Sequence, residues 1–334
     1  MRRVLVFSLS QLFLFVSVNG QSTSPTFAEK LGYPKGAKVL ILHVDDAGMS
    51  YDSNDGAMSA ILDGAANSCS VMMPCPWVPS FVRFLKEHPE IDAGLHLTLT
   101  SEWKDYKWSP VTGRENVPGL TDSAGYFWPG VGAVVQHASA DEVEKEIRAQ
   151  VTKARSMGFN PTHLDSHMGT VFASPAFLER YIKVGISESI PVMVPGGHAR
   201  NIQQEMNLPE ASMLQLRAIG NMLWSAGLPV IDDLHNTTYD WTIPDSLESD
   251  DKIQEFRTKQ YIDALKKLEP GITMLIMHCT QPSPIFKQIS DSGDKRKGDL
   301  LVMLNPLFKK ALQEQGIILT TWREMKERKA KSNQ

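Results

Sequence analysis

LILHVDDAGMS, residues 40–50, is the stretch that decides the fold. An apolar segment of β type runs here directly into two adjacent carboxylates, Asp45 and Asp46, and then into Gly48 and Ser50. In α/β proteins, active sites are built where parallel strands end. Asp and Ser also favour turns and helix N-termini. Taken alone, the pair is therefore compatible with a structural cap and with an active site.

The rest of the chain alternates between short apolar segments and longer amphipathic segments, which indicates strands and helices in turn. Strands are expected at residues 38–44, 68–73, 92–98, 162–165, 191–194, 228–231, 271–277 and 317–321. Helices are expected at residues 52–65, 77–87, 141–157, 175–184, 211–226, 252–268 and 299–315, before a charged tail. This alternation predicts an α/β fold with mainly parallel strands, and polar residues at several strand ends favour a distorted (β/α) barrel.

Residues 1–20 have the pattern of a secretory signal peptide. Arg2 and Arg3 precede an apolar run from Val4 to Val18, and Gly20 supplies a small residue before the expected cleavage point. The run is shorter than the ~20 residues of a comfortable membrane span, so no stable span is expected, although an uncleaved anchor stays open. We therefore expect an exported protein, periplasmic or extracellular.

The mature chain is expected to hold one domain. Residues 21–36 form an amino-terminal lead, and residues 37–328 form the domain. A segment at about 101–138 breaks the alternation and concentrates Trp, Tyr and Phe among Gly and Pro. A loop of this length either lines a substrate site or covers a small core of its own.

Composition excludes some classes of partner. The chain has 334 residues, 42% hydrophobic and 22% charged, with a net charge of -4, which gives no electrostatic case for nucleic acid. Nothing in the sequence excludes a homodimer. Cys69 and Cys75 would suit a disulfide in an exported protein, with Cys279 left over. Three buried thiols are the other reading.

Four segments share one form, in which an apolar strand ends in His or Asp. They supply Asp45 and Asp46, then His96, then His163, Asp165 and His167, and finally His278. If the strands are parallel, these ends converge on one edge of the sheet. Two imidazoles and one carboxylate form a set that suits zinc or another divalent metal, and a second carboxylate nearby can act as general base. Spacing alone does not decide which aspartate takes which role.

The segment from His163 to His167 contains alternating ligand types. His163, Asp165 and His167 would share a face on a regular strand. A turn at Asp165–Ser166 would instead free His167 to project into the site, and Asp165 could then orient a neighbouring histidine. His163 and Asp165 are thus candidates for supporting or substrate-contacting roles.

These motifs resemble those of a known family. Residues 44–50 resemble the ADDFG-S opening of the YdjC-type carbohydrate deacetylases, which include chitooligosaccharide deacetylases. Residues 94–100 are similar to the GxHLNLT segment of that family, residues 162–167 match its THLDSH segment, and residues 277–278 resemble its late HPG strand end. The resemblance runs in the same order through nearly the whole mature chain.

The resemblance implies a barrel of the polysaccharide deacetylase type that removes acetyl groups from N-acetylated sugars, so the expected partner is a carbohydrate that carries an acetamido group. It implies one divalent metal ion, with zinc or magnesium expected, on Asp46, His96 and His167. Asp45 would be the general base, and His278 the acid or the group that stabilises the oxyanion. The implied course is attack of metal-bound water on the amide carbonyl.

The chain departs from the family pattern at Ala47, Thr98, Met168 and Cys279, where Phe, Asn, His and Pro are usual. These changes leave the metal set intact and put the usual sugar pocket in question. Two alternatives stay open: another metal hydrolase on the same fold, such as an O-deacetylase or phosphodiester hydrolase, and a non-catalytic sugar-binding protein. The lack of clustered Lys or Arg near the motifs disfavours phosphate. Retention of both aspartates disfavours a binder.

Overall fold

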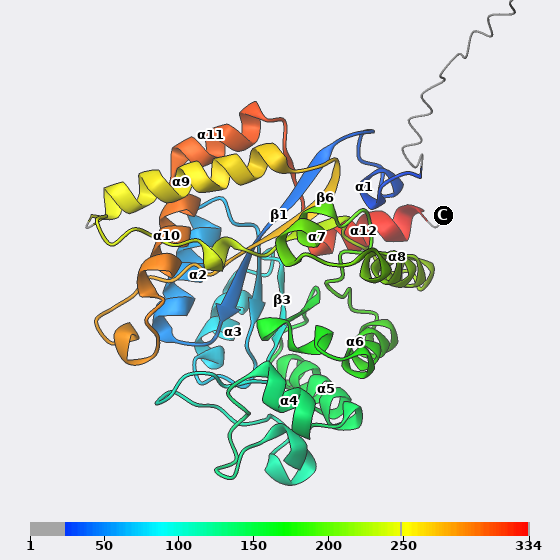
Figure 1. Cartoon of the computed structure of the whole chain (residues 1–334), viewed down its shortest axis with the longest axis vertical. Coiled ribbons are helices and arrows are strands. Elements are labelled where there is room, and N and C mark those ends of the chain that lie inside the picture. Colours follow the sequence, from blue (N-terminus) through cyan, green and yellow to red (C-terminus); the bar gives the residue numbers. More distant parts are fainter. Residues whose placement is uncertain (1–23, 248, 333–334) are drawn as a thin grey trace, which may run out of the picture.

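A parallel sheet lies at the centre of the molecule with helices around it (Figure 1). This computed structural model describes residues 24–247 and 249–332, so the expected signal peptide lies outside the described residues. Within those two ranges, no helix combines the length and the apolar character needed to cross a membrane.

The strands are ordered β4-β3-β2-β1-β6-β5, and β7 pairs with the first half of β1. Every pairing between these strands is parallel. The sheet consists of β1 (Lys38–Ala47), β2 (Ser68–Val71), β3 (Ala93–Leu97), β4 (Leu164–Ser166), β5 (Asp233–His235), β6 (Gly271–Met277) and β7 (Ile318–Leu319).

The two edges of this sheet are joined through residues 191–195. Leu164 in β4 forms a parallel bridge with Val192, and Pro195 forms another with Ile231, just before β5. The expected distorted barrel of parallel strands is therefore confirmed. The expected strands at 191–194 and 228–231 are wrong, since each contributes only a single bridge. Both segments contain proline, which has no N–H to donate to a continuous ladder.

Most expected helices form close to their predicted positions. They are α2 (Tyr51–Leu62), α3 (Val78–Glu87), α5 (Ala140–Ser156), α6 (Pro175–Glu188), α8 (Glu210–Ser225) and α9 (Asp250–Lys267). Three short helices were not predicted: α1 (Phe27–Lys30), α4 (Val131–His137) and α7 (Arg200–Met206). In α5, Ser139 and Glu142 form a reciprocal capping box that fixes where the helix begins.

The carboxyl-terminal part differs from expectation. The helix expected at 299–315 is two helices, α10 (Gly293–Leu304) and α11 (Pro306–Glu314). Pro306 cannot donate within a continuous helix, and the Asn305 side chain caps α11 by accepting from the backbone N–H of Leu307. The expected charged tail is helix α12 (Trp322–Ser332), which buries Trp322 completely.

Strand β1 is buried on both faces, as expected for a parallel strand inside a barrel. Leu40, Leu42 and Val44 pack in one apolar cluster, whereas Val39 and Ile41 pack in the other. Because side chains alternate along a strand, the two clusters lie on opposite faces of the sheet. This explains why the sequence of β1 reads as a nearly continuous apolar run.

The amino-terminal lead is anchored by Asp232, which is buried. Its carboxylate accepts hydrogen bonds from the backbone N–H groups of Phe27 and Ala28 in α1, at 2.8 and 3.0 Å, and from that of Ile272 in β6, at 2.9 Å. The neighbouring Asp233 accepts from backbone N–H groups at the start of α7. This second Asp-Asp pair has a structural role.

Replacing Asp232 by alanine should lower the free energy of unfolding by about 3 kcal/mol, because three buried N–H groups lose their acceptor. Urea denaturation of Asp232→Ala, compared with Asp291→Ala at an exposed position, measures the difference. Equal midpoints for the two variants would contradict this role.

Candidate metal centre

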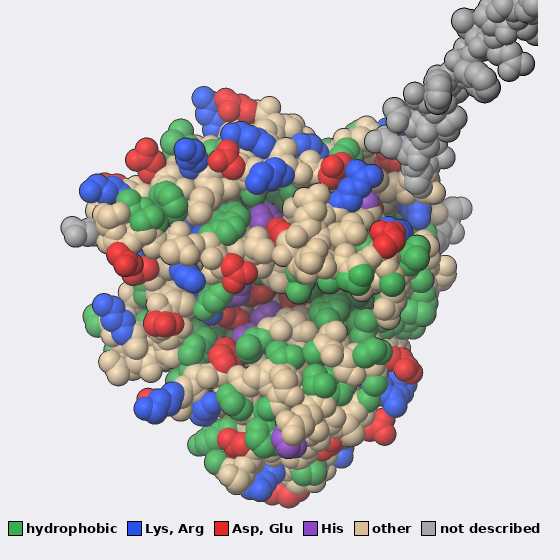
Figure 2. All heavy atoms as spheres, viewed as in Figure 1, with side chains coloured by type: hydrophobic (Ala, Val, Ile, Leu, Met, Phe, Trp, Pro, Cys, Tyr) green, Lys and Arg blue, Asp and Glu red, His purple; other side chains and the backbone are tan. Residues whose placement is uncertain are grey.

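Six of the seven predicted site residues gather at the carboxyl edge of the sheet, at the ends of β1 (Asp45, Asp46), β3 (His96), β4 (Asp165, His167) and β6 (His278). His163 differs from them, because it directly precedes β4. Histidine and acidic side chains line the floor of a hollow in the face shown in Figure 2, over the end of β1 in Figure 1. The register of β1 against β2 shifts between Val44 and Ala47.

That irregularity determines where the two aspartates point. Asp46 has a φ of 65°, in the left-handed region that residues other than glycine rarely adopt. Adjacent residues of a regular strand face opposite sides of the sheet. The local distortion lets both carboxylates approach His96, with Asp46 Oδ1 at 3.4 Å and Asp45 Oδ2 at 3.7 Å from its Nε2. Such backbone strain is common at functional sites.

Asp46, His96 and His167 form the centre of this cluster, and all three are buried. Asp46 Oδ1 lies 3.4 Å from His96 Nε2 and 3.4 Å from His167 Nδ1. Within the described part of the chain, this oxygen has no hydrogen-bond partner. A buried, unpartnered carboxylate oxygen facing two imidazole nitrogens is the donor set that a divalent cation would satisfy. The cluster is compatible with a divalent metal ion.

Each histidine of this cluster has its second ring nitrogen held by a carboxylate. His96 Nδ1 lies 2.6 Å from Asp165 Oδ1, and His167 Nε2 lies 3.1 Å from both oxygens of Glu102. In metal sites, such contacts fix the tautomer and orientation of the ligating ring. Burial lowers the pKa of His167, but Glu102 and Asp46 more than offset this and raise it to about 9.

The second oxygen of Asp46 is held by Arg296 of α10, whose Nη1 lies 2.7 Å from Oδ2. Burial alone would raise the pKa of Asp46, but Arg296 and the neighbouring histidines outweigh it and hold the pKa well below its usual value. The guanidinium lies beside the rings of Tyr239 and Trp103, at 5.3 and 5.9 Å from their centroids. Arg296 thus leaves only Oδ1 of Asp46 free for a cation.

His278 also lies beside Asp45, with its Nε2 3.9 Å from Asp45 Oδ2. Burial and the nearby Arg296 lower the pKa of His278, which favours the neutral imidazole. Its backbone N–H donates to Asp299 Oδ2 at 3.0 Å. Asp299 is in turn held by Arg257 and by the hydroxyl of Tyr261, so the end of β6 is fixed by a buried polar network.

His163 lies deeper than the other histidines. It is fully buried, stacks on the Trp322 ring, and places its Nε2 3.6 Å from Asp165 Oδ2. A β-carbon at Gly94 would lie 2.5 Å from the His163 ring, so the glycine of the GLH segment makes room for it. We therefore place His163 behind the site and away from any substrate.

Glu102, Arg296 and His43 are the site residues that the sequence did not reveal. Glu102 lies in the insertion at 101–138, and Arg296 lies in a segment with no motif. The sequence does give a hint of His43, because it is a titratable residue inside an otherwise apolar strand. The insertion buries Trp108 and Phe127 in the main core instead of covering a small core of its own, and its Glu102 reaches the cluster. A substrate-lining role for this segment stays a prediction. The three cysteines are free and buried.

Replacing Glu102 by glutamine should weaken divalent-metal binding roughly 10- to 100-fold, because the His167 ring loses the carboxylate that orients it. Titration of the metal-free protein with zinc, followed by calorimetry, measures the change. Glu115→Gln, at an exposed position of the same insertion, is the matched control. Identical affinities for the two variants would refute the assignment of Glu102.

The fold and the cluster together define an α/β barrel protein with a candidate metal centre at its strand ends. Residues 39–314 match the family described as YdjC-like protein. A carbohydrate deacetylase from Thermus thermophilus is 31% identical over 299 residues, which cover 90% of this chain and 97% of that protein. The chain belongs to the YdjC-like family.

Two further comparisons agree with this membership. A chitooligosaccharide deacetylase from Yersinia enterocolitica is 26% identical over 178 residues, 52% of this chain and 66% of that protein. A crystal structure from Enterococcus faecalis, of a candidate cellobiose-phosphate cleavage protein, superposes with a TM-score of 0.68 at 21% identity. It covers 86% of this chain and 99% of that one, and it shows the same fold.

Proposed function

We propose that this protein is an exported, metal-dependent carbohydrate deacetylase that removes acetyl groups from N-acetylated sugars. The observation that carries the proposal is the buried Asp46–His96–His167 cluster, with the unpartnered Asp46 Oδ1 at its centre and Asp45 and His278 beside it. The names of the relatives from Thermus thermophilus and Yersinia enterocolitica support the substrate class. The segment from Arg2 to Val18 supports export.

Asp46, His96 and His167 would hold one divalent ion, zinc or magnesium. When bound there, the ion would polarise the amide carbonyl and lower the pKa of a water molecule. Asp165 and Glu102 keep the two imidazoles oriented toward it, and Arg296 occupies the other oxygen of Asp46. The residues therefore fit an N,N,O set that leaves room for water and substrate.

We infer that Asp45 acts as the general base. Its Oδ1 is engaged by His43 and Ser70, at 3.2 and 3.4 Å, whereas its Oδ2 faces His96 and His278. A carboxylate with one oxygen fixed and the other turned to the site can accept a proton from the attacking water. Hydrolysis then yields acetate and the free amine of the sugar.

We infer that His278, which also faces Asp45 Oδ2, acts on the same carbonyl or on the leaving group. Its imidazole can donate from Nε2 to the oxyanion, or pass a proton to the amine nitrogen. The half-buried rings of Trp103 and Tyr239, which flank Arg296, offer apolar surface to a sugar ring. We infer that the acetamido group enters between these rings and Asp45.

Replacing Asp45 by asparagine should leave metal content unchanged and lower acetate release at least ~100-fold, because the water loses its base. The measurement is acetate release from N-acetylated and O-acetylated oligosaccharides, together with metal analysis of each protein. Asp63→Asn, exposed at the end of α2, is the control. Release from neither class by the wild-type protein would refute the proposed function, and release from O-acetylated sugars alone would correct the bond cleaved.

A further inference from the structure

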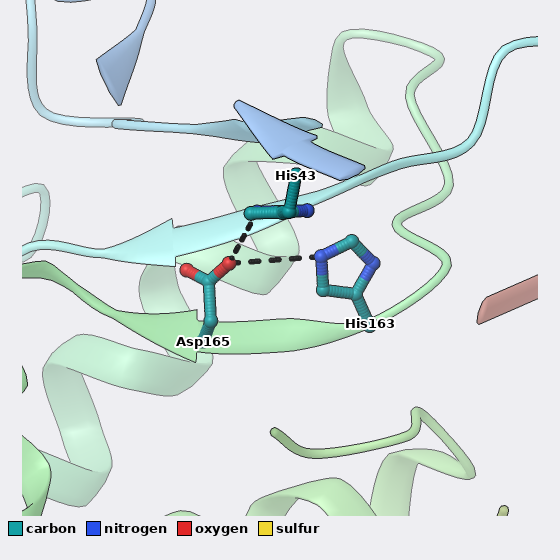
Figure 3. Close-up of side chains that lie close together, drawn as sticks. All are labelled: His43, His163 and Asp165. Atoms are coloured by element: carbon teal, nitrogen blue, oxygen red, sulfur yellow. Dashed lines mark ion pairs between the residues drawn. The ribbon is translucent and has the colours of Figure 1, made fainter. Parts of the chain in front are cut away.

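A second group of buried histidines and carboxylates lies behind the metal cluster. Figure 3 shows His43, from β1, and His163, which directly precedes β4, pointing at Asp165. His43 Nε2 lies 2.9 Å from Asp165 Oδ2 and 3.2 Å from Asp45 Oδ1. Strands β1 and β4 are separated by β2 and β3, so side chains from β1 and β4 meet only on the inner side of the barrel. His43 therefore connects the proposed base to the carboxylate that orients His96.

The groups around the two ring nitrogens of His43 indicate its protonation state. Ser68 Oγ donates to Asp92 Oδ2 at 2.7 Å, and a hydroxyl has a single proton, so Ser68 accepts from His43 Nδ1 at 2.9 Å. His43 Nε2 lies 2.9 Å from Asp165 Oδ2 and 3.2 Å from Asp45 Oδ1. An ionised carboxylate can only accept, so Nε2 carries a proton as well. Ser70 Oγ lies 3.1 Å from His43 Nε2 and 3.4 Å from Asp45 Oδ1.

The charges around His43 agree with this assignment. Burial of the ring lowers its pKa, but Asp165 and Asp45 more than offset the burial and raise the pKa to about 9. The other histidine that faces it, His163, lies at a ring distance of 5.0 Å. Burial and the neighbouring His43 lower the pKa of His163, while Asp165 and Asp92 oppose this. His163 is thus neutral, and His43 is the cation of this group.

We propose that His43 is a permanently protonated positioning residue, which fixes Oδ1 of the base Asp45 directly and through Ser70 while it holds Asp165 against His96. The inference rests on the proposed function and adds a residue to it. With Oδ1 fixed, Oδ2 is the oxygen of Asp45 that turns toward His96 and His278. One buried imidazolium thereby determines which oxygen of Asp45 faces His96 and His278, and it also helps to orient the His96 ring through Asp165.

The same atoms could also be taken for a second metal site, because His43, His163 and Asp165 each bring one donor atom within 4.8 Å of the others. Like Asp46 Oδ1, the atoms Asp165 Oδ2 and His163 Nε2 have no hydrogen bond within the described part of the chain. The protons on His43 nevertheless argue against a metal ion here. A metal-binding imidazole must present an unprotonated nitrogen, and both nitrogens of His43 are occupied as donors. The group is therefore an ion pair, and one metal ion per chain is expected.

The test replaces His43 by glutamine in the metal-loaded, full-length mature protein. We expect unchanged metal content, KM within about twofold, and kcat lower by about 10- to 100-fold, because the base is no longer held in place. A purely structural role would instead lower the metal content or the urea midpoint of unfolding along with kcat.

His163→Gln is the matched control, since it removes an equally buried histidine that contacts Asp165 but not Asp45. Its kcat should stay close to the wild-type value. An unchanged kcat in His43→Gln, or an equal loss of kcat in both variants, would overturn the proposal. Two metal ions per wild-type chain, falling to one in His43→Gln, would also overturn it and favour the second metal site.

Nitrogen NMR of histidine-labelled wild-type holoenzyme tests the same proposal without any variant and without turnover. Between pH 6 and 8, the His43 ring should show protons on both nitrogens throughout. A ring with one unprotonated nitrogen in this range would overturn the proposal. Failure of the proposed function is distinguishable, because it appears as a lack of acetate release by the wild-type protein and leaves this spectrum unaffected.

Discussion

Burying the Asp46 carboxylate at the end of β1 is the constraint on which the rest of the site depends. An ionised carboxylate without partners is strongly destabilising in a protein interior. Arg296 satisfies one of its oxygens, and the other faces His96 and His167. The strained φ of Asp46 persists because these contacts hold it in place. A divalent ion would satisfy the unpartnered Oδ1 of Asp46, so the cluster is compatible with a metal-binding site.

The surrounding residues follow the same rule, in which each buried carboxylate has a cationic or donating partner. Asp165 lies between His96 and His43, Glu102 contacts His167, and Asp299 is held by Arg257. Breaking one such pair leaves the other charge buried and unpaired, which costs several kcal/mol in comparable sites, roughly 3 to 5. The side chains are thus fixed before substrate arrives, as electrostatic preorganisation requires.

Local sequence predicted the parts of this structure that depend on local physics. β6 was predicted to the residue because an apolar run between Gly271 and His278 can only be a buried parallel strand here. The six site residues at strand ends were predicted because parallel strands end on one edge. The break at Asn305–Pro306 had a local signal in the proline, which the apolar periodicity on either side obscured. The single bridges at 191–195 had no local signal in the sequence, because they depend on where the barrel closes.

Arg296 and Glu102 could not be found from sequence for a different reason. Arg296 and Asp46 are separated by 250 positions and meet only in the folded chain. Glu102 lies in an insertion that is rich in aromatic residues, and no motif there indicates its contact with His167. The proposed division of roles between Asp45 and Asp46 rests on one backbone angle and on contacts with His43 and Arg296, which adjacent positions in a sequence do not encode.

The most direct test of the central claim is a crystal structure of the zinc-loaded protein with anomalous data collected on both sides of the zinc edge. The account predicts one peak, about 2.0–2.2 Å from Asp46 Oδ1, His96 Nε2 and His167 Nδ1, with Asp45 outside the coordination sphere. A peak between His43, His163 and Asp165, or one that is bound by Asp45 in place of Asp46, would contradict it.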